Sequence, residues 1–191
     1  MKVIKYPAKE EWSEIVKRPH LDVSKLNATV QGVLDDVKKH GDEAVTRYEE
    51  KFDHAHLDSL AVTEAEIEEA EQLVSQELKD ALHLAHHNIA AFHQSQKFEG
   101  EKIETCPGVT CWQKSVAIQK VGLYIPGGTA PLFSTVLMLA TPAKIAGCEE
   151  IVLCTPPNQE GKVNPAILMA AKIAGVSKIF KAGGVQAIGA M

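Results

Sequence analysis

The sequence predicts an α/β protein, and three observations predict it. Apolar residues in the first half of the chain recur at helical spacing. From residue 120 onward, short buried-strand patterns alternate with helical segments. Glycine pairs follow two of those strands, where the chain turns into the next helix. We therefore expect an N-terminal, mostly helical region with a small β element over residues 1–119. An incomplete Rossmann-like parallel βαβαβ sheet follows over residues 120–191.

Composition is that of an ordinary globular protein. The residues are 45% hydrophobic and 24% charged, and a length of 191 residues suffices for a hydrophobic core. The net charge of -5 argues against a nucleic-acid-binding surface. No apolar run approaches the ~18 residues of a membrane span, and the N-terminus lacks the apolar core of a signal peptide. Four cysteines without a CxxC pair predict reduced thiols and a cytoplasmic protein.

Short helices are predicted in the first sixty or so residues. Ala8–Lys17 reads as an amphipathic helix that stops before Pro19. Its apolar face comprises Trp12, Ile15 and Val16. Apolar residues from Leu26 to Val37 then fall at helical spacing, and His40-Gly41 ends that helix. Asp42 is predicted to cap the next helix.

The clearest helix start is at Thr63. Thr63 and Glu66 have the spacing of a capping box, and Val62 can pack onto Ile67 as a hydrophobic staple. The apolar stripe that follows runs to Phe92 and is long enough for two helices, with Ser75 as the second cap. Two roles for it remain open, a packing element of the core or part of an oligomer interface.

A small antiparallel element is predicted next. Pro107-Gly108 is a turn signal, and β-prone segments around Ile103 and over Val109–Trp112 flank it. This element leads into the first strand of the parallel sheet.

Three buried strands are predicted in the last third of the chain, at Val121–Ile125, Glu150–Cys154 and Lys178–Lys181. The intervening helices are Ser134–Ala146, which Gly147 would end, and Ala166–Ala174, which Asn164-Pro165 would begin and Gly175 would end. A further helix starts at Gln186. This alternation favours right-handed parallel crossovers.

Ligands of open parallel sheets bind beyond the carboxyl ends of the strands. Three loops qualify here, Tyr124–Ala130, Cys154–Gly161 and Ala182–Gln186. Glycine pairs before a helix suit the approach of a phosphate to backbone N–H groups. Tyr124 could supply a ring and a hydroxyl, and Gln186 an amide. The glycines could equally serve tight turns and close helix–sheet packing, and because GxGxxG is absent both interpretations remain open.

Other chemical groups give weaker signals. His83 and His87 are four residues apart and could share a metal, but no further ligand is evident, so we favour a polar helix face. Asp53–His56 reads as a solvated loop. Cys111 and Cys148 are nucleophile candidates. We interpret Cys148 as a buried, inert thiol, and Cys111 could equally be a packed hydrophobic residue. No Ser/His/Asp set or carboxylate pair stands out.

At this point the motifs resemble a known family, histidinol dehydrogenase. The resemblance is carried by VGLYIPGGTAPLFSTVLMLATPAKIAGC, EIVLCTPP, PAILMAAKIAGV and KAGGVQAIGAM, and earlier by GDEAVTRYEEKFD, NIAAFHQSQ and CWQKSVAIQKVG. It runs in order over nearly the whole chain. Ala117 and Phe133 depart from residues common in the family, and neither departure affects the assignment.

The resemblance implies an enzyme that oxidises L-histidinol through the aldehyde to L-histidine, using NAD and zinc, in histidine biosynthesis. It also implies an interlocked homodimer. Carried over by position, Tyr124, Pro126 and Gln186 would contact NAD. The family's catalytic and zinc-binding residues would lie beyond residue 191, so no catalytic or metal residue is assigned here. We expect this N-terminal portion alone to form no NADH from histidinol. The alternative is a non-catalytic nucleotide- or phosphate-binding α/β module.

Overall fold

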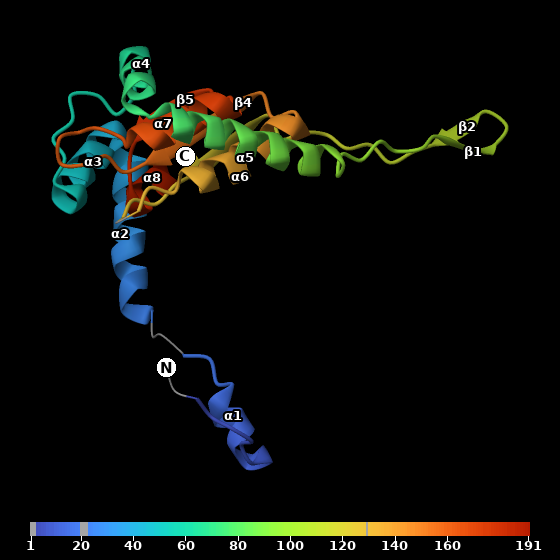
Figure 1. The fold of residues 1–191 in the computed structure, drawn as a ribbon, viewed down its shortest axis with the longest axis horizontal. Helices are drawn as coiled ribbons and strands as arrows, with labels where there is room; N and C mark the ends of the chain where they lie inside the picture. Colours follow the sequence, from blue (N-terminus) through green and yellow to red (C-terminus); the bar gives the residue numbers. More distant parts are fainter. Residues whose placement is uncertain (1–2, 20–22, 129) are drawn as a thin grey trace.

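The body of the protein is a parallel sheet with helices on both faces (Figure 1). A computed structural model describes residues 3–19, 23–128 and 130–191. The parallel sheet, the helices around it and a separate two-stranded antiparallel sheet confirm the predicted fold class.

The parallel sheet consists of β3 (Lys120–Tyr124), β4 (Glu150–Thr155) and β5 (Lys178–Lys181), in the order β3-β4-β5. Tyr124 is paired with Cys154, which is paired in turn with Phe180. The carboxyl ends of all three strands therefore lie at one edge of the sheet, as the alternating pattern predicts.

One face of the sheet is covered by α6 (Phe133–Ala146) and α7 (Pro165–Ala174). Two helices from the first half of the chain, α4 (Glu64–Leu73) and α5 (Gln76–Gln94), pack against them. The resulting apolar cluster includes Leu153 of β4 and Ile179 of β5 together with Leu82, Val136, Leu137 and Ile167. The long apolar stripe thus serves as a packing element of the core.

The other face is covered by α2 (Ser24–His40), α3 (Asp42–Tyr48) and α8 (Gly184–Ala190). A second apolar cluster forms there from Val33, Val37, Ala44, Val45, Cys154, Ala182 and Ala187. Because side chains alternate along a strand, Leu153 and Cys154 of β4 contribute to opposite clusters.

Most predicted helix ends are confirmed. Gly147 ends α6 with φ of 91°, and the Asn164 side chain accepts from the Ala166 N–H at 2.9 Å at the start of α7. Three predicted helix starts are wrong by one or two residues. α6 begins at Phe133 rather than Ser134. The cap of α3 is Gly41, with φ of 56°, so Asp42 is the first helical residue. The last helix starts at Gly184 rather than Gln186, because Gly183 already has the extended conformation of a cap.

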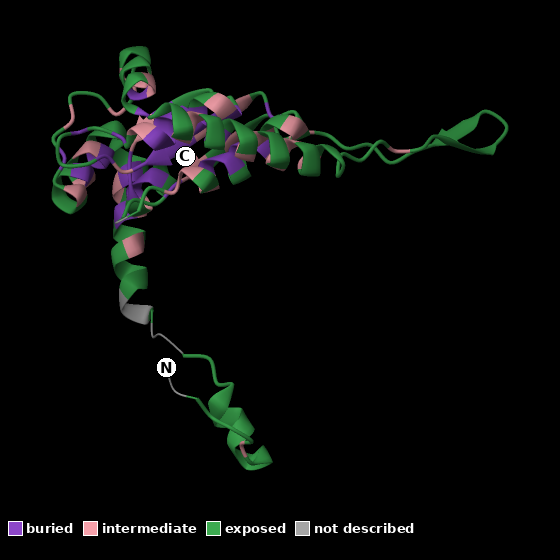
Figure 2. Cartoon of the chain, viewed as in Figure 1, coloured by how far each residue is buried: buried purple, intermediate pink, exposed green. Residues whose placement is uncertain are grey.

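Two segments project from the body and are largely exposed (Figure 2). The N-terminal one contains a 3-10 turn, η1 (Lys9–Glu11), and one α-helical turn, α1 (Trp12–Ile15), in place of the single helix predicted over Ala8–Lys17. Its apolar face is uncovered, since Trp12, Ile15 and Val16 are all exposed. An amphipathic segment with no neighbouring surface gains little from continuing its helix.

The second projecting segment is the predicted hairpin, formed by β1 (Ile103–Cys106) and β2 (Val109–Cys111). Gly108 adopts φ of 83° in the turn, which a glycine accommodates readily. The hairpin lies at the tip of a long arm, far from the sheet (Figure 1).

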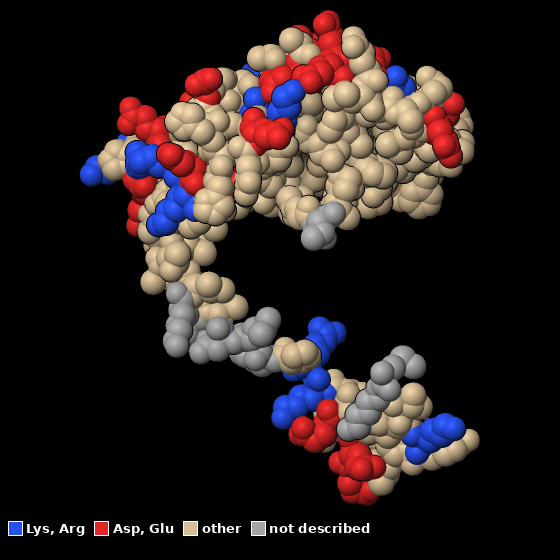
Figure 3. All heavy atoms as spheres, turned by 60° about the vertical axis from the view of Figure 1, so that its left-hand side comes forward, with Lys and Arg blue, Asp and Glu red and all other residues tan. Residues whose placement is uncertain are grey.

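On the face shown in Figure 3, aspartate and glutamate side chains gather along the upper edge, with a few lysine and arginine side chains beside them. Among the described residues, no helix is long and apolar enough to cross a membrane.

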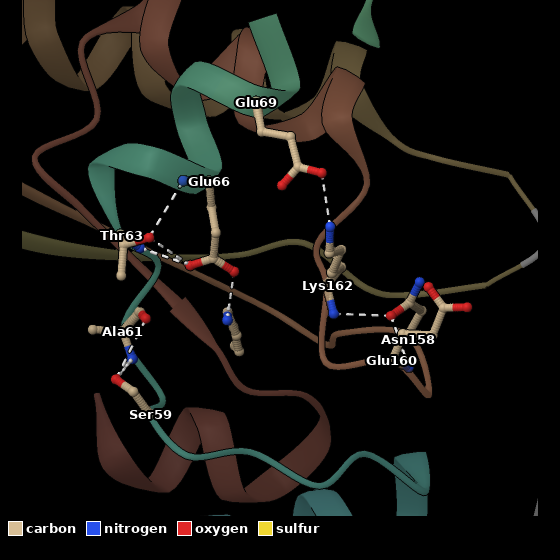
Figure 4. A network of polar contacts seen from close by, with 9 residues as sticks. Ser59, Ala61, Thr63, Glu66, Glu69, Asn158, Glu160 and Lys162 are labelled. Carbon is tan, nitrogen blue, oxygen red and sulfur yellow. Dashed lines mark hydrogen bonds and ion pairs between the residues drawn. The ribbon is translucent and has the colours of Figure 1, made fainter. Parts of the chain in front are cut away.

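The capping box of α4 is confirmed (Figure 4). The Thr63 hydroxyl accepts from the Glu66 N–H at 3.3 Å, and the Glu66 carboxylate accepts from the Thr63 N–H at 2.8 Å. Glu66 also pairs with Lys181 of β5 at 2.6 Å. Burial would raise the pKa of Glu66, but its bonds to Lys181 and Thr63 outweigh burial and lower that pKa. The box therefore ties the start of α4 to the sheet.

A Thr63→Ala variant should lose about 1 kcal/mol of unfolding free energy, because an N–H at the helix start loses its acceptor. Urea denaturation followed by circular dichroism measures this loss. Thr63→Ser keeps the hydroxyl and is the matched control, with stability close to that of the unmodified protein. Equal losses in both variants would show that the cap contributes nothing.

Candidate functional site

A cavity of about 700 Å³ lies at the carboxyl ends of the three parallel strands. Each of the three predicted loops contributes to its wall, while Thr129 lies outside the described residues. The lining includes Tyr124, Pro126, Gly128, Thr155, Pro156, Asn158, Lys162 and Gly184. Its volume is within the range of about 300–1,000 Å³ that is usual for small-molecule sites.

Pro156, in the loop after β4, fixes the spacing of the other two loops. A Cβ atom added to Gly127 would stand 2.5 Å from the Pro156 ring, and one added to Gly183 would stand 2.8 Å from it. These two glycines thus permit close packing, the structural role left open by the sequence. Gly128 is different, since a Cβ there would meet nothing within 4 Å and its φ is 150°. Its backbone is the part of this loop open to a ligand.

Tyr124 joins the first loop to the third. Its hydroxyl accepts from the Gly184 N–H at 2.9 Å, and its side chain lines the cavity. Pro126, two residues on, lines the same cavity and is exposed. The structure therefore brings Tyr124 and Pro126 together in one wall.

Gln186 lies beneath this wall rather than in it. Its side chain is 1% exposed, and its amide donates to Oε1 of Glu49 at 2.8 Å. Its own Oε1 would stand 2.9 Å from a Cβ added to Gly184. Gln186 is not among the residues that line the cavity, so it supports the Gly183–Gly184 turn from below.

Glu49 is a buried carboxyl group that organises the same turn. It begins η2 (Glu49–Asp53), a five-residue π-helical segment that ends at His54 in the left-handed conformation. Its Oε1 accepts from the Gly183 N–H at 2.8 Å as well as from Gln186. At the other end of η2, Asp53 lines the cavity. Short π-helical segments are often found at functional sites.

The charge on the cavity wall is sparse. In the described part of the chain, Lys162 is its one lysine or arginine and Asp53 its one carboxylate. The Lys162 ammonium pairs with Glu69 at 2.8 Å, and this contact raises the pKa of Lys162 (Figure 4). The Asn158 side chain accepts from the Lys162 N–H at 2.8 Å and from the Glu160 N–H at 3.0 Å. These bonds hold the loop that carries the lysine.

The start of α6 borders the cavity through Ala130 and Pro131. Among the residues that the structure describes, no side chain caps this helix, whose cap residue is Leu132. Helix N-termini with unpaired N–H groups favour anions. An uncapped helix start, a lysine and an accessible glycine backbone suit a ligand that carries phosphate.

Other candidates lie elsewhere. His83, His86 and His87 are on α5, and among the described residues no three His, Cys, Asp or Glu side chains are placed to hold a metal ion. Cys148 is buried, as predicted, whereas Cys111 is exposed on the hairpin, so the interpretation of Cys111 as a packed residue is wrong. The prediction of a solvated loop at Asp53–His56 is wrong in part, because Ala55 is buried and Asp53 lines the cavity.

Sequence reasoning missed Glu49, Asp53 and Lys162. The first two stand in the stretch GDEAVTRYEEKFD, where their spacing of four places both on one side of a helical turn. That spacing is common on solvated helices, so it does not single them out. Their partners lie far along the chain.

The sequence model of the family described as Histidinol dehydrogenase matches residues 16–191. A Bacteroides fragilis protein named histidinol dehydrogenase is 66% identical over 191 residues, which are 100% of this chain and 45% of that protein. An Escherichia coli K12 protein of the same name is 47% identical over 183 residues, covering 95% of this chain and 41% of that protein.

A crystal structure of histidinol dehydrogenase from Elizabethkingia anophelis has a similar fold, with a TM-score of 0.91 and 49% sequence identity. The match covers 97% of this chain and 43% of that one. The chain thus spans less than half the length of the relatives it matches.

Proposed function

The chain belongs to the histidinol dehydrogenase family, and on that premise we propose that it forms the N-terminal part of an NAD- and zinc-dependent enzyme. That enzyme oxidises L-histidinol through the aldehyde to L-histidine. The cavity at the carboxyl edge of the sheet is its NAD site.

One observation carries the assignment of the site. All three loops that follow the parallel strands meet around a single cavity of about 700 Å³. Tyr124 and Pro126, which the family resemblance relates to NAD, both line it. Ligand binding beyond the carboxyl ends of parallel strands is the general rule for such sheets.

The residues of this chain bind and orient. Tyr124 holds the Gly183–Gly184 turn through its hydroxyl and offers its ring to the cavity. The α6 start and Lys162 supply positive potential for a pyrophosphate. Gln186, which the family resemblance also relates to NAD, lies under the turn, and its amide donates to Glu49. NAD would supply the hydride acceptor for this chemistry, with one NAD used for each of the two oxidation steps.

No step is assigned to a metal held by this chain, because the described residues offer no set of three ligands. The zinc ligands, the general base and the histidinol-binding residues belong to the remainder of the enzyme in this proposal. We also place the enzyme in the cytoplasm as a homodimer. The uncovered apolar side chains of the hairpin arm, Trp112, Val116 and Ile118, support an arm that packs on a second subunit.

In the full-length dehydrogenase, Tyr124→Phe should weaken NAD binding about 3- to 10-fold, because the Gly184 N–H loses its acceptor and the turn loosens. Tyr124→Ala also removes the ring, and we expect a loss of roughly 10- to 100-fold. Isothermal titration calorimetry with NAD measures both losses.

Tyr6→Phe is the matched control, since Tyr6 is 99% exposed and lies on the N-terminal segment. Its affinity for NAD should equal that of the unmodified enzyme. Unchanged affinity in Tyr124→Ala would place the NAD site elsewhere.

A further inference from the structure

The Glu49 carboxyl group is fully buried and only half satisfied. Its exposed fraction is 0%. Oε1 accepts from the Gly183 N–H and the Gln186 amide, both at 2.8 Å. Oε2 is buried and has no hydrogen-bond donor among the described residues. A buried carboxylate oxygen without a hydrogen-bond donor costs free energy. A proton on this oxygen, or on an acidic neighbour that donates to it, would remove that cost.

Asp53 is placed to share that proton. It lies at the other end of the π-helical segment, four residues on. Both carboxyl groups lie beside Gly183, whose N–H donates to Glu49 Oε1 at 2.8 Å and where an added Cβ would stand 3.1 Å from Asp53 Oδ2. Ionised carboxylates are acceptors only, so two of them form a hydrogen bond only when one carries a proton. Adjacent carboxyl groups that share a site bind one proton more tightly than an isolated group does.

The surroundings favour retention of this proton. Burial raises the pKa of Glu49, and the charge of Asp53 adds to the rise, although the Gly183 and Gln186 bonds oppose it. Burial also raises the pKa of Asp53. This effect is larger than the opposite effects of the bond to Glu49 and of the exposed His54, which lower that pKa. Cys154 of β4 faces Glu49 and stays protonated, because burial and that carboxyl group raise its pKa to about 11. Among the described residues, neither acid has a lysine or arginine ion-pair partner.

We propose that Glu49 and Asp53 share one proton and thereby hold the Gly183–Gln186 turn in the shape that receives NAD, so that NAD binding weakens as the pH rises. This inference rests on the proposed function. Glu49 is a positioning residue, because it acts through Gly183 and Gln186 and does not line the cavity.

Loss of the proton has two effects on the cavity. Repulsion between the two carboxylates disturbs the segment that holds the turn. Asp53 lines the cavity and lies against Gly183, where an added Cβ would stand 3.1 Å from its Oδ2. Its full charge then faces the anionic pyrophosphate of NAD. Both effects lower the affinity at high pH.

The unfolding free energy is also expected to fall as the pH rises. The ordinary values are 4.5 for Glu49 and 3.8 for Asp53, and folding raises both pKa values. The folded protein therefore keeps a proton that the unfolded chain releases. The stabilisation is complete below the ordinary carboxyl range and is lost as the pH rises through the raised pKa.

The test is the pH dependence of NAD binding to the full-length dehydrogenase, measured by calorimetry at about pH 5.5 and about pH 8.5. We expect the affinity of the unmodified enzyme to fall by roughly 10-fold across this range, the scale of one like-charge interaction at short range in water-like surroundings. Glu49→Gln keeps the acceptor oxygen and removes the titration, so its affinity should change less than about 2-fold. Asp53→Asn should behave likewise. Glu50→Gln is the matched control, because it makes the same change at the exposed neighbouring residue. Its affinity for NAD should fall with pH as that of the unmodified enzyme does.

The outcomes separate the two proposals. No NAD binding by the unmodified enzyme at either pH contradicts the proposed function. NAD binding with one slope shared by all four proteins overturns the carboxyl pair and leaves the cofactor site intact. If Glu49→Gln does not fold, Asp53→Asn together with an infrared titration of the unmodified enzyme decides. An infrared band of a protonated carboxyl group that persists at pH values above the ordinary carboxyl pKa range supports the shared proton. The absence of such a band refutes it.

Discussion

A Leu153→Ala variant is expected to lose about 2–5 kcal/mol of unfolding free energy, the largest effect foreseen for a single change in this chain. Leu153 is fully buried in the central strand and belongs to the apolar cluster shared with α4, α5, α6 and α7. Removing its side chain leaves a cavity that the surrounding helices fill only in part. Urea denaturation of the chain, followed by circular dichroism, measures the loss.

Leu84→Ala is the matched control, because Leu84 is 62% exposed on α5. The same chemical change there should cost less than about 0.5 kcal/mol. If the two variants lost equal stability, the sheet and its helices would not share the packed core described above.

Gly183→Ala should lower the unfolding free energy by about 1–3 kcal/mol through overpacking and should also weaken NAD binding. Its φ of -109° suits any residue, so the cost is steric. The new Cβ would stand 2.8 Å from a ring carbon of Pro156, which has no rotamer to escape into, and 3.1 Å from Asp53. Thermal denaturation and NAD calorimetry on the full-length dehydrogenase measure the two effects.

Gly32→Ala is a control of opposite sign. Gly32 is exposed within α2, and a Cβ there meets nothing within 4 Å. Alanine should stabilise the helix by about 0.5–1 kcal/mol. A destabilisation of similar size at both glycines would mean that the contact with Pro156 is not the cause.

The sequence predicted features whose partners are close along the chain. Thr63 caps through a residue three positions away, and Asn164 through one two positions away. Such contacts leave a local signature that can be recognised without knowing the fold. Asp42 shows the limit, since a capping residue type stands next to Gly41, which takes the cap instead. Errors of one residue at helix ends are common for this reason.

The position of the cavity agrees with an expectation drawn from topology alone. Parallel strands joined by helices must end at one edge, so the three loops were expected to converge, and they do so around the cavity. Tyr124 was identified together with its loop. That its hydroxyl would bond the Gly184 N–H, 60 residues away, has no signature in the sequence.

The same limit explains why Glu49 was missed. Its bonds to Gly183 and Gln186 span 134 and 137 residues. A glutamate on a charged helix is normally solvated, and nothing nearby in the sequence marks this one as buried. The secondary structure of the two projecting segments was predicted in outline, but their exposure was not. An amphipathic pattern indicates that one face is apolar and does not indicate which surface covers that face.

The distance along the chain between Glu49 and Gln186 also bears on how the protein is made. Synthesis proceeds from the N-terminus at about 5–20 residues per second, so Glu49 waits on the order of 10 s for its partners to emerge. During that interval α2 and α3 lack the strand and helix that complete their apolar cluster. The strand–helix units from β3 onward make their contacts over shorter spans, and closing a long loop onto them afterwards adds little entropy cost. The apolar cluster under α2 and α3 therefore cannot be complete until β5 and α8 have been made, and the Gly183–Gly184 turn is the point at which Glu49 joins the two parts of the chain.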